Sequence, residues 1–175
     1  MEYRELKTEE INRELFSGFN RRQIVTDCVR RENGKWTIKS DPFIDDWSEE
    51  DLEFGIGCWR NTVSSGGFVY GAFADGVLKG FVSVEAGLFG GEHKYLDLSS
   101  LHISADMRGK GTGRALFNAA CDWARAHGAR KLYISSHSAV ETQRFYKAMG
   151  CTEAALYNKK HVAEEPFDIQ LEYRL

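Results

Sequence analysis

The stretch Arg108-Gly109-Lys110-Gly111-Thr112-Gly113-Arg114 decides the fold of this chain, because it joins a strand-like run at 95–103 to a helical run at 111–126. Three alternating glycines let the backbone turn tightly and bring its N–H groups close to an anion. The N-terminus of the following helix adds a partial positive charge, and Arg108, Lys110 and Arg114 add formal charge. The stretch predicts a strand, turn and helix that together hold a diphosphate.

Two common nucleotide-binding motifs do not fit these residues. The dinucleotide motif Gly-x-Gly-x-x-Gly would need a third glycine where Arg114 or Leu116 stands. A Walker A loop needs Ser or Thr after Gly-Lys, but Gly111 follows Lys110. A nucleotide phosphotransferase is therefore disfavoured, and a glycine-rich turn that only starts a helix is the simpler alternative.

Apolar periodicity continues the pattern of strands and helices away from this turn. Strands are predicted at 68–73 and 77–84, which form a hairpin around Asp75-Gly76, and at 95–103, 131–136, 151–157 and 167–174. Helices are predicted at 48–63 after Ser48, at 111–126, and from a Ser138-x-x-Glu141 capping box to Gly150.

The N-terminal part is expected to be mainly helical. A short strand at 1–7 precedes helices at 8–17 and 20–31, and the aromatic segment 34–47 is expected to be irregular. The whole order predicts an α/β (α+β) fold with a mixed sheet, in a single domain over residues 1–175.

Composition limits the class of protein. The 175 residues, 42% of them hydrophobic, suffice for one core but not for two ordinary domains. No apolar run approaches the ~20 residues that cross a bilayer, and the charged start is unlike a signal peptide, so we expect a cytoplasmic protein without membrane association. A net charge of -3 gives no general attraction to nucleic acid. The four cysteines are widely spaced and expected to be free, and no spacing predicts a metal site.

Three segments together resemble the GNAT superfamily of N-acetyltransferases. Arg108, Gly111 and Gly113 fill the pattern Arg/Gln-x-x-Gly-x-Gly/Ala of that family's pyrophosphate loop, and the preceding strand ends five residues earlier, at Ile103. Phe145-Tyr146-x-x-x-Gly150 lies where the family has a similar segment. The resemblance covers about 68–175 and implies a largely antiparallel sheet flanked by helices. It also implies that 68–175 binds the cofactor and that N-terminal helices and a loop within 18–66 form the acceptor side.

By this resemblance the cofactor is acetyl-coenzyme A, the acetyl donor. The backbone of Leu101 and Ile103 should pair with the pantetheine arm, and residues 108–114 should hold the pyrophosphate. The residues expected to bind the cofactor are Leu101, His102, Ile103, Arg108, Gly109, Lys110, Gly111, Thr112, Gly113, Arg114, Thr142 and Phe145.

The resemblance also implies two catalytic residues. Tyr146 should act as general acid, because a phenol of pKa ~10 is protonated at neutral pH and can donate to a thiolate of lower pKa. Asp97 aligns with a Glu that removes the proton of the acceptor amine in many relatives. A structural role for Asp97, a bridging water, and Glu85 as the base remain open alternatives.

The acceptor is expected to be a primary amine of a small, cationic molecule. Acidic and aromatic side chains alternate between 41 and 54, which suits a cation, although acids in the first turn of a helix explain part of the pattern. The candidate acceptor-binding residues are Trp36, Phe43, Asp45, Asp46, Trp47 and Glu85. A peptide amine as acceptor, and a non-catalytic acyl-coenzyme A-binding module, are the alternatives. A homodimer would agree with many relatives.

Overall fold

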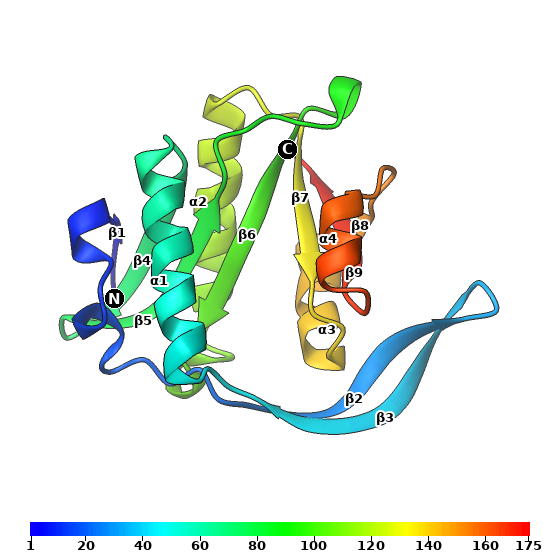
Figure 1. Cartoon of the computed structure of the whole chain (residues 1–175), viewed down its shortest axis with the longest axis horizontal. Coiled ribbons are helices and arrows are strands. Elements are labelled where there is room, and N and C mark those ends of the chain that lie inside the picture. The colour runs from blue at the N-terminus through cyan, green and yellow to red at the C-terminus, as the bar shows by residue number, and fades with distance from the viewer.

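A seven-stranded sheet in the order β1-β4-β5-β6-β7-β9-β8 forms the centre of the protein, and a separate two-stranded hairpin extends from it (Figure 1). The structure is a computed structural model that describes all residues, 1–175. The strands of the sheet are β1 Glu2–Glu5, β4 Phe68–Ala74, β5 Val77–Val84, β6 Tyr95–Ile103, β7 Lys131–Ser136, β8 Thr152–Glu153 and β9 Ile169–Arg174. Only β6 and β7 pair in parallel, which confirms the expected largely antiparallel mixed sheet.

Helices cover both faces of the sheet. They are α1 Glu49–Ser64, α2 Thr112–Ala126, α3 Val140–Met149 and α4 Lys159–Glu164. The core against α2 and α3 contains Leu96 and Leu98 of β6, whereas α1 packs on alternate residues of β4 and β5, such as Val69 and Phe81. Because side chains alternate along a strand, α2 and α3 lie on one face, and α1 lies on the other face together with α4 (Figure 1).

Local sequence signals place the first helix and the first hairpin of the sheet as expected. The Ser48 hydroxyl accepts a hydrogen bond from Asp51 N–H at 3.1 Å, and the Asp51 carboxylate accepts one from Ser48 N–H at 2.9 Å, which caps α1. Asp75 and Gly76 both have positive φ, 50° and 76°, as a two-residue hairpin turn requires.

The seam between β6 and β7 is short. The parallel pairing joins only Tyr95–Asp97 to Lys131–Tyr133. Just beyond, β6 carries a β-bulge, because Ser83 pairs with Ser100 and Val84 with Leu98, so Ser99 has no opposite residue on β5. The two strands then separate, and a gap opens between the later part of β6 and the end of β7 (Figure 1).

The prediction of N-terminal helices was largely wrong. Residues 20–31 are not helical but contain most of β2, Gln23–Glu32, and the segment expected to be irregular forms β3, Lys35–Asp45. Asn33 and Gly34 join them with φ values of 48° and 78°. Residues 8–17 contain two single 3₁₀ turns instead of a helix. The side of the molecule assigned to the acceptor is therefore built from one helix, α1, and the β2–β3 hairpin.

The hairpin links the two sides of the gap. Val29 N–H donates to the Ser138 carbonyl at 2.8 Å, and Cys28 forms an antiparallel bridge with Ala139, beside the start of α3. Val25, Cys28 and Ala139 bury a small apolar cluster at this contact. The hairpin thus runs below the gap from the β6 side to the β7 side (Figure 1).

The C-terminal part differs from the prediction in two places. Ser138 does not cap α3, whose N-cap is Ala139 without a side-chain hydrogen bond, because the Ser138 hydroxyl accepts from Arg30 of the hairpin instead. The strand expected at 151–157 is reduced to β8, and α4 follows, capped by Asn158, whose side chain accepts from Lys160 N–H at 3.0 Å. Gly150 ends α3 with a φ of 91°, as predicted. None of the helices combines the length and the apolar character that a membrane span needs.

Candidate functional site

The edge of β6 that borders the gap exposes backbone hydrogen-bonding groups. Ser104 N–H donates to the Lys79 carbonyl at 2.9 Å, so this end of β6 is in antiparallel register with β5. Alternate residues of a strand direct their backbone groups to opposite sides. Leu101 and Ile103 therefore point theirs away from β5 and into the gap, where they suit an extended ligand that carries amide groups.

The glycine-rich turn lies at the open end of this edge. Gly109 and Gly111 have φ values of 75° and 86°, which favour glycine, although a Cβ at either would meet no other atom. Gly111 is the N-cap of α2, which has neither a capping side chain nor an acidic residue in its first turn. The first N–H groups of α2 therefore remain available to an anion such as a diphosphate.

The three basic side chains of the turn have different surroundings. Arg108 donates to the carbonyls of Ile103 (3.2 Å), Arg22 (2.9 Å) and Arg21 (2.8 Å), so it ties the turn to the chain that enters the hairpin. Lys110 and Arg114 are exposed and make no ion pair. Arg108 therefore has mainly a positioning role, and Lys110 and Arg114 are the cations free to neutralise a diphosphate.

Helix α3 packs against the same turn. The Phe145 ring packs so closely on Gly113 that a Cβ at this position would lie 3.2 Å from the ring, so the absence of a side chain allows the contact. Thr142 is half-buried on the same helix. Tyr146 is buried, and this burial raises the pKa of its phenol above the usual 10.0, with smaller contributions from Cys151 and Asp168. Its hydroxyl is therefore protonated over the whole neutral range and has a proton to donate.

Asp97 lies at the point where β6 and β7 separate, and its partner is a residue that the sequence did not indicate. His161 Nε2 of α4 is 2.6 Å from Asp97 Oδ2, whereas Asp97 Oδ1 is buried without a hydrogen-bond partner. The hydrogen bond to Asp97 raises the pKa of His161, and burial opposes this only in part. The two residues lie 64 positions apart in the chain, and helix α4 was not predicted. The sequence therefore contained no signal for this pair.

Glu85, the competing base, is bound to its neighbours. Its Oε1 accepts hydrogen bonds from Thr62 at 2.8 Å and from Ser99 of the bulge at 2.6 Å. Its backbone N–H donates to the Asp97 carbonyl at 2.9 Å. Glu85 thus stabilises the bulge, and it contributes negative charge to the face that carries α1.

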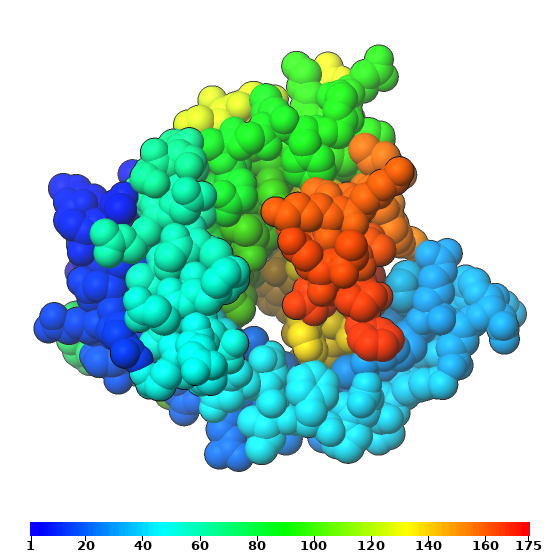
Figure 2. Space-filling view, viewed as in Figure 1, coloured from blue at the N-terminus to red at the C-terminus, as the bar shows by residue number.

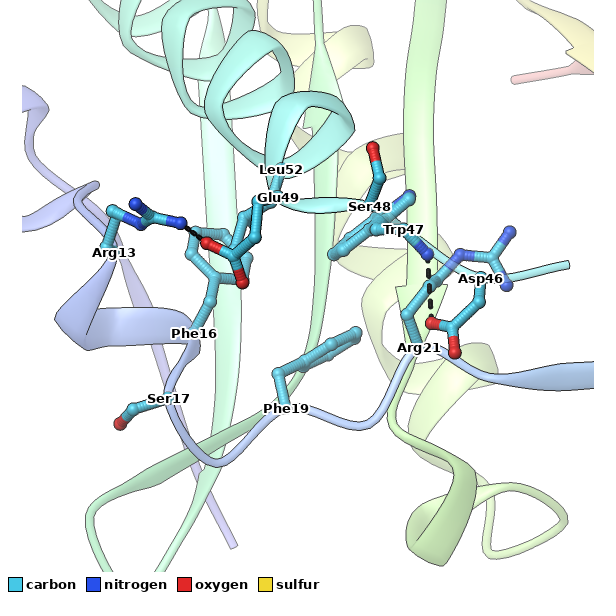
Figure 3. Close-up of a pocket in the computed structure, with 10 residues that line it drawn as sticks. All are labelled: Arg13, Phe16, Ser17, Phe19, Arg21, Asp46, Trp47, Ser48, Glu49 and Leu52. Atoms are coloured by element: carbon cyan, nitrogen blue, oxygen red, sulfur yellow. Dashed lines mark hydrogen bonds and ion pairs between the residues drawn. The ribbon is translucent and has the colours of Figure 1, made fainter.

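Apart from the gap between β6 and β7, a recess of about 350 Å³ lies beside Trp47 at the start of α1 (Figure 3). Trp47 stacks on Phe19 with ring centres 5.7 Å apart and meets the edge of His102 at 5.1 Å. Burial, followed by the charges of Arg21 and Arg108, lowers the pKa of His102 to about 3, so its ring is neutral. The residues that line the recess are Arg13, Phe16, Ser17, Phe19, Arg21, Asp46, Trp47, Ser48, Glu49 and Leu52.

The structure separates the six candidate acceptor residues. Only Asp46 and Trp47 border this recess. Asp45 forms an ion pair with Arg21, Glu85 lies at the bulge, and Phe43 contacts the His137 ring at 5.5 Å. Trp36 donates to Glu153 near the tip of the hairpin, roughly 30 Å along the strand from Asp45 at ~3.3 Å per residue. The hairpin explains this spread, because the segment expected to fold as one loop is extended.

The surface between α1 and α4 is hollowed (Figure 2). α1 borders the hollow on one side, the segment with α4 on the other, and the hairpin below. Asp97, on the face of β6 that carries these helices, and His161 of α4 lie on this side of the sheet. A second ligand can therefore approach the gap from the face opposite to α2 and α3.

Comparison with known proteins agrees with this geometry. A family model described as "Acetyltransferase (GNAT) family" matches residues 33–151. No curated protein matches the chain. Among solved structures, nourseothricin acetyltransferase has a TM-score of 0.70 at 20% identity, covering 99% of this chain and 97% of that one.

Two further structures were solved with a coenzyme. A putative streptothricin acetyltransferase from Bacillus anthracis str. Ames, in complex with acetyl coenzyme A, has a TM-score of 0.75 at 15% identity, covering 99% of this chain and 98% of that one. PaiA N-acetyltransferase from Thermoplasma acidophilum, in complex with coenzyme A, has a TM-score of 0.60 at 16% identity, with coverages of 99% and 98%. At these identities the likeness concerns the fold.

Proposed function

The chain belongs to the GNAT acetyltransferase family, and from this premise we propose that it transfers the acetyl group of acetyl-coenzyme A to a primary amine of a small, cationic molecule. The observation that carries the proposal is the gap between β6 and β7, bordered by the backbone groups of Leu101 and Ile103 that face away from β5 and ending at the uncapped N-terminus of α2. When bound there, acetyl-coenzyme A supplies an activated thioester.

The residues around the gap fit this cofactor. Leu101 and Ile103 offer backbone groups to the amides of the pantetheine arm, and the first turn of α2 with Lys110 and Arg114 offers positive charge to the diphosphate. Tyr146 holds a proton for the departing sulfur. The acetyl group is passed directly to the amine, without a covalent intermediate on the protein.

A cationic acceptor is favoured by the charges on the open face. Asp97 and Glu85 lie beside the bulge, Asp46 borders the recess near α1, and the Trp47 ring can contact a cation. The structures of similar fold include acetyltransferases named for nourseothricin and streptothricin, and we propose the same class of acceptor for this chain. A peptide amine is the alternative acceptor, and the thiol-release measurement distinguishes the two.

Thermal unfolding with and without acetyl-coenzyme A tests the cofactor. A ligand at 100 times its Kd adds about 2.7 kcal/mol of stability, so the unfolding temperature should rise clearly. Gly111→Glu should abolish the rise, because it places a negative charge at the N-terminus of α2.

Gly128→Glu is the matched control. Gly128 lies at the other end of the same helix, also has a positive φ, 80°, and also has open space around a Cβ. Both variants place a side chain at a residue of positive φ, but only the Gly111 variant should lose the response to acetyl-coenzyme A. Equal responses in both would contradict the proposed diphosphate site.

Release of the coenzyme A thiol identifies the acceptor class. The wild-type protein is mixed with acetyl-coenzyme A and, in turn, nourseothricin, kanamycin, spermidine or a peptide with a free N-terminal alanine. We expect turnover with one of the three small amines. Turnover with the peptide alone would replace the proposed acceptor class by a peptide amine.

A further inference from the structure

The contact between Asp97 and His161 brings together two groups from distant parts of the chain. Asp97 stands on β6 at the last residue paired with β7, and His161 stands on α4, which follows the short strand β8. The Tyr133 ring of β7 stacks on the imidazole with ring centres 5.9 Å apart. The imidazole is thus fixed by a hydrogen bond at one nitrogen and by a ring against its face.

The hydrogen bond decides which nitrogen of His161 is free. Nε2 lies 2.6 Å from a carboxylate oxygen, so it carries a hydrogen and donates it. Nδ1 has no partner within the chain, and 24% of the side-chain surface is exposed. A neutral His161 therefore carries an unpaired lone pair on Nδ1, and part of its side chain is exposed on α4, which borders the hollow.

We propose that His161 is the base that takes the proton from the acceptor ammonium, and that Asp97 is a positioning residue that orients the imidazole. The proposal rests on the function proposed above and identifies a further residue of that site. It changes the role of Asp97, which the sequence suggested as the base.

Asp97 is poorly suited to be the base itself. One of its oxygens is engaged by His161, and the other is buried without a partner. An imidazole that donates one nitrogen to a carboxylate keeps the other nitrogen free to take a proton, and histidine is the side chain that most often acts as a base near neutral pH. The ionisable groups around His161 are Asp97 of β6, Tyr133 of β7, Asp168 before β9, and Lys160 and Glu164 of α4. Three of these are acids that stabilise the protonated ring.

The proton transfers balance. His161 Nδ1 removes one proton from the ammonium and leaves a neutral amine with a lone pair. As the amine nitrogen forms its bond to the acetyl carbon and the carbon–sulfur bond breaks, Tyr146 gives its phenolic proton to the sulfur and regains a proton from the nitrogen. His161 then releases its proton to solvent, so each turnover yields the amide, a thiol and one proton.

NMR of the protein labelled with ¹⁵N-histidine tests the pair without any ligand. We expect His161 to carry its hydrogen on Nε2 when neutral, and to titrate above 6.5. In Asp97→Asn the titration should move to lower pH. An Nδ1–H tautomer in the wild type, or a titration that Asp97→Asn leaves in place, would overturn the proposal. This result does not depend on whether the acceptor class is right.

Kinetics test the catalytic role, with the amine from the thiol-release measurement that gives the fastest turnover. His161→Ala should lower kcat about 100-fold or more, remove the acidic limb of the pH profile, and leave the KM for acetyl-coenzyme A unchanged. Added imidazole should restore part of the rate by occupying the vacated space. Unchanged turnover, or a loss without rescue and without change in the pH profile, would show that His161 is only structural.

His127→Ala is the control, because His127 is exposed at the end of α2 and stacks on Trp123, on the other face of the sheet. Its kinetics should match the wild type. His161→Gln serves as a second variant if the alanine variant unfolds. If the wild type acetylates none of the four amines, the proposed acceptor class fails, while the NMR result still decides whether the Asp97–His161 pair exists as described.

Discussion

Two buried tyrosines on neighbouring elements differ in what their hydroxyls do. Tyr133 of β7 donates to Gln170 and accepts from Asn158 N–H at 2.8 Å, which holds the start of α4 against the sheet. No hydrogen bond contributes to the raised pKa of Tyr146 on α3. The Tyr133 hydroxyl therefore has a structural role, whereas the Tyr146 hydroxyl is available for proton transfer.

Substituting each tyrosine by phenylalanine should separate the effects. Tyr146→Phe should leave the free energy of unfolding nearly unchanged and lower kcat for thiol release about 100-fold, because only the proton donor is lost. Tyr133→Phe should cost about 1–3 kcal/mol, since Asn158 N–H loses its partner. Chemical unfolding measures the free energy of unfolding of both variants, and steady-state kinetics measures their kcat. Full activity of Tyr146→Phe would remove the general-acid role.

Among single residues, the sequence predicted those that belong to short local motifs and missed those whose role depends on contacts with distant parts of the chain. The glycine turn and Tyr146 belong to short motifs whose spacing can be read directly. His161 becomes relevant only through α4, a six-residue helix that the periodicity did not indicate, and through a partner 64 positions away. Asp45 was expected to bind a cationic acceptor, but its charge is offset by Arg21.

The hairpin was missed although it carried a strong local signal. Asn33-Gly34 between runs rich in β-branched residues is a common sequence for a two-residue turn, and both residues adopt the positive φ that this turn needs. The spacing of Ile24, Cys28 and Val29 also fits a helix, so periodicity alone did not decide. Tertiary contacts with Ser138 and Ala139 complete the strand.

Arg108 is expected to hold the hairpin rather than the cofactor. Arg108→Ala removes hydrogen bonds to the carbonyls of Arg21, Arg22 and Ile103, which should lower the free energy of unfolding by about 2 kcal/mol and speed amide exchange in β2. Lys110→Ala, two residues away and exposed, should leave both unchanged and weaken acetyl-coenzyme A binding. Hydrogen exchange and calorimetry distinguish the two, and slow exchange in β2 of Arg108→Ala would contradict the assignment.

Across the whole molecule, Glu172 of β9 joins several elements of the C-terminal half. Its carboxylate accepts from Tyr95 of β6, from Lys131 of β7 at 2.6 Å and from Ala155 N–H at 3.0 Å. Burial raises the pKa of Glu172, but these hydrogen bonds outweigh it, and the pKa lies below its ordinary 4.5. The charged form is thus the one that stabilises the fold.

Acid should remove this contribution. A pKa that is lower in the folded than in the unfolded protein adds stability above pH 4.5, and this is lost as the pH falls through the folded value. Glu172→Gln should therefore cost about 2 kcal/mol at pH 7, and the difference from wild type should shrink below pH 4.5. Glu92→Gln, at an exposed acid without a hydrogen bond or ion pair, is the control and should show neither effect. Urea unfolding at several pH values measures both.

The sheet of the molecule was predictable, but the way its parts enclose the site was not. From β4 onwards the order of strands and helices follows from alternation, caps and glycines in the sequence, apart from the C-terminal segment around β8 and α4. The three-residue seam, the bulge at Ser99 and the course of the hairpin depend on contacts between distant segments. Such contacts have no local pattern, and they are the features that shape the gap.

The docking of the hairpin has a consequence for the order of folding. Its own turn closes over two residues and can form within microseconds, whereas its contact with Ser138 joins positions 108 residues apart in the chain. Closing so long a loop has a large entropic cost, and the contact exists only after β7 and α3 are in place. A hairpin whose own turn closes early is therefore attached to the rest of the fold late, and the binding gap is complete only once this long-range contact has formed.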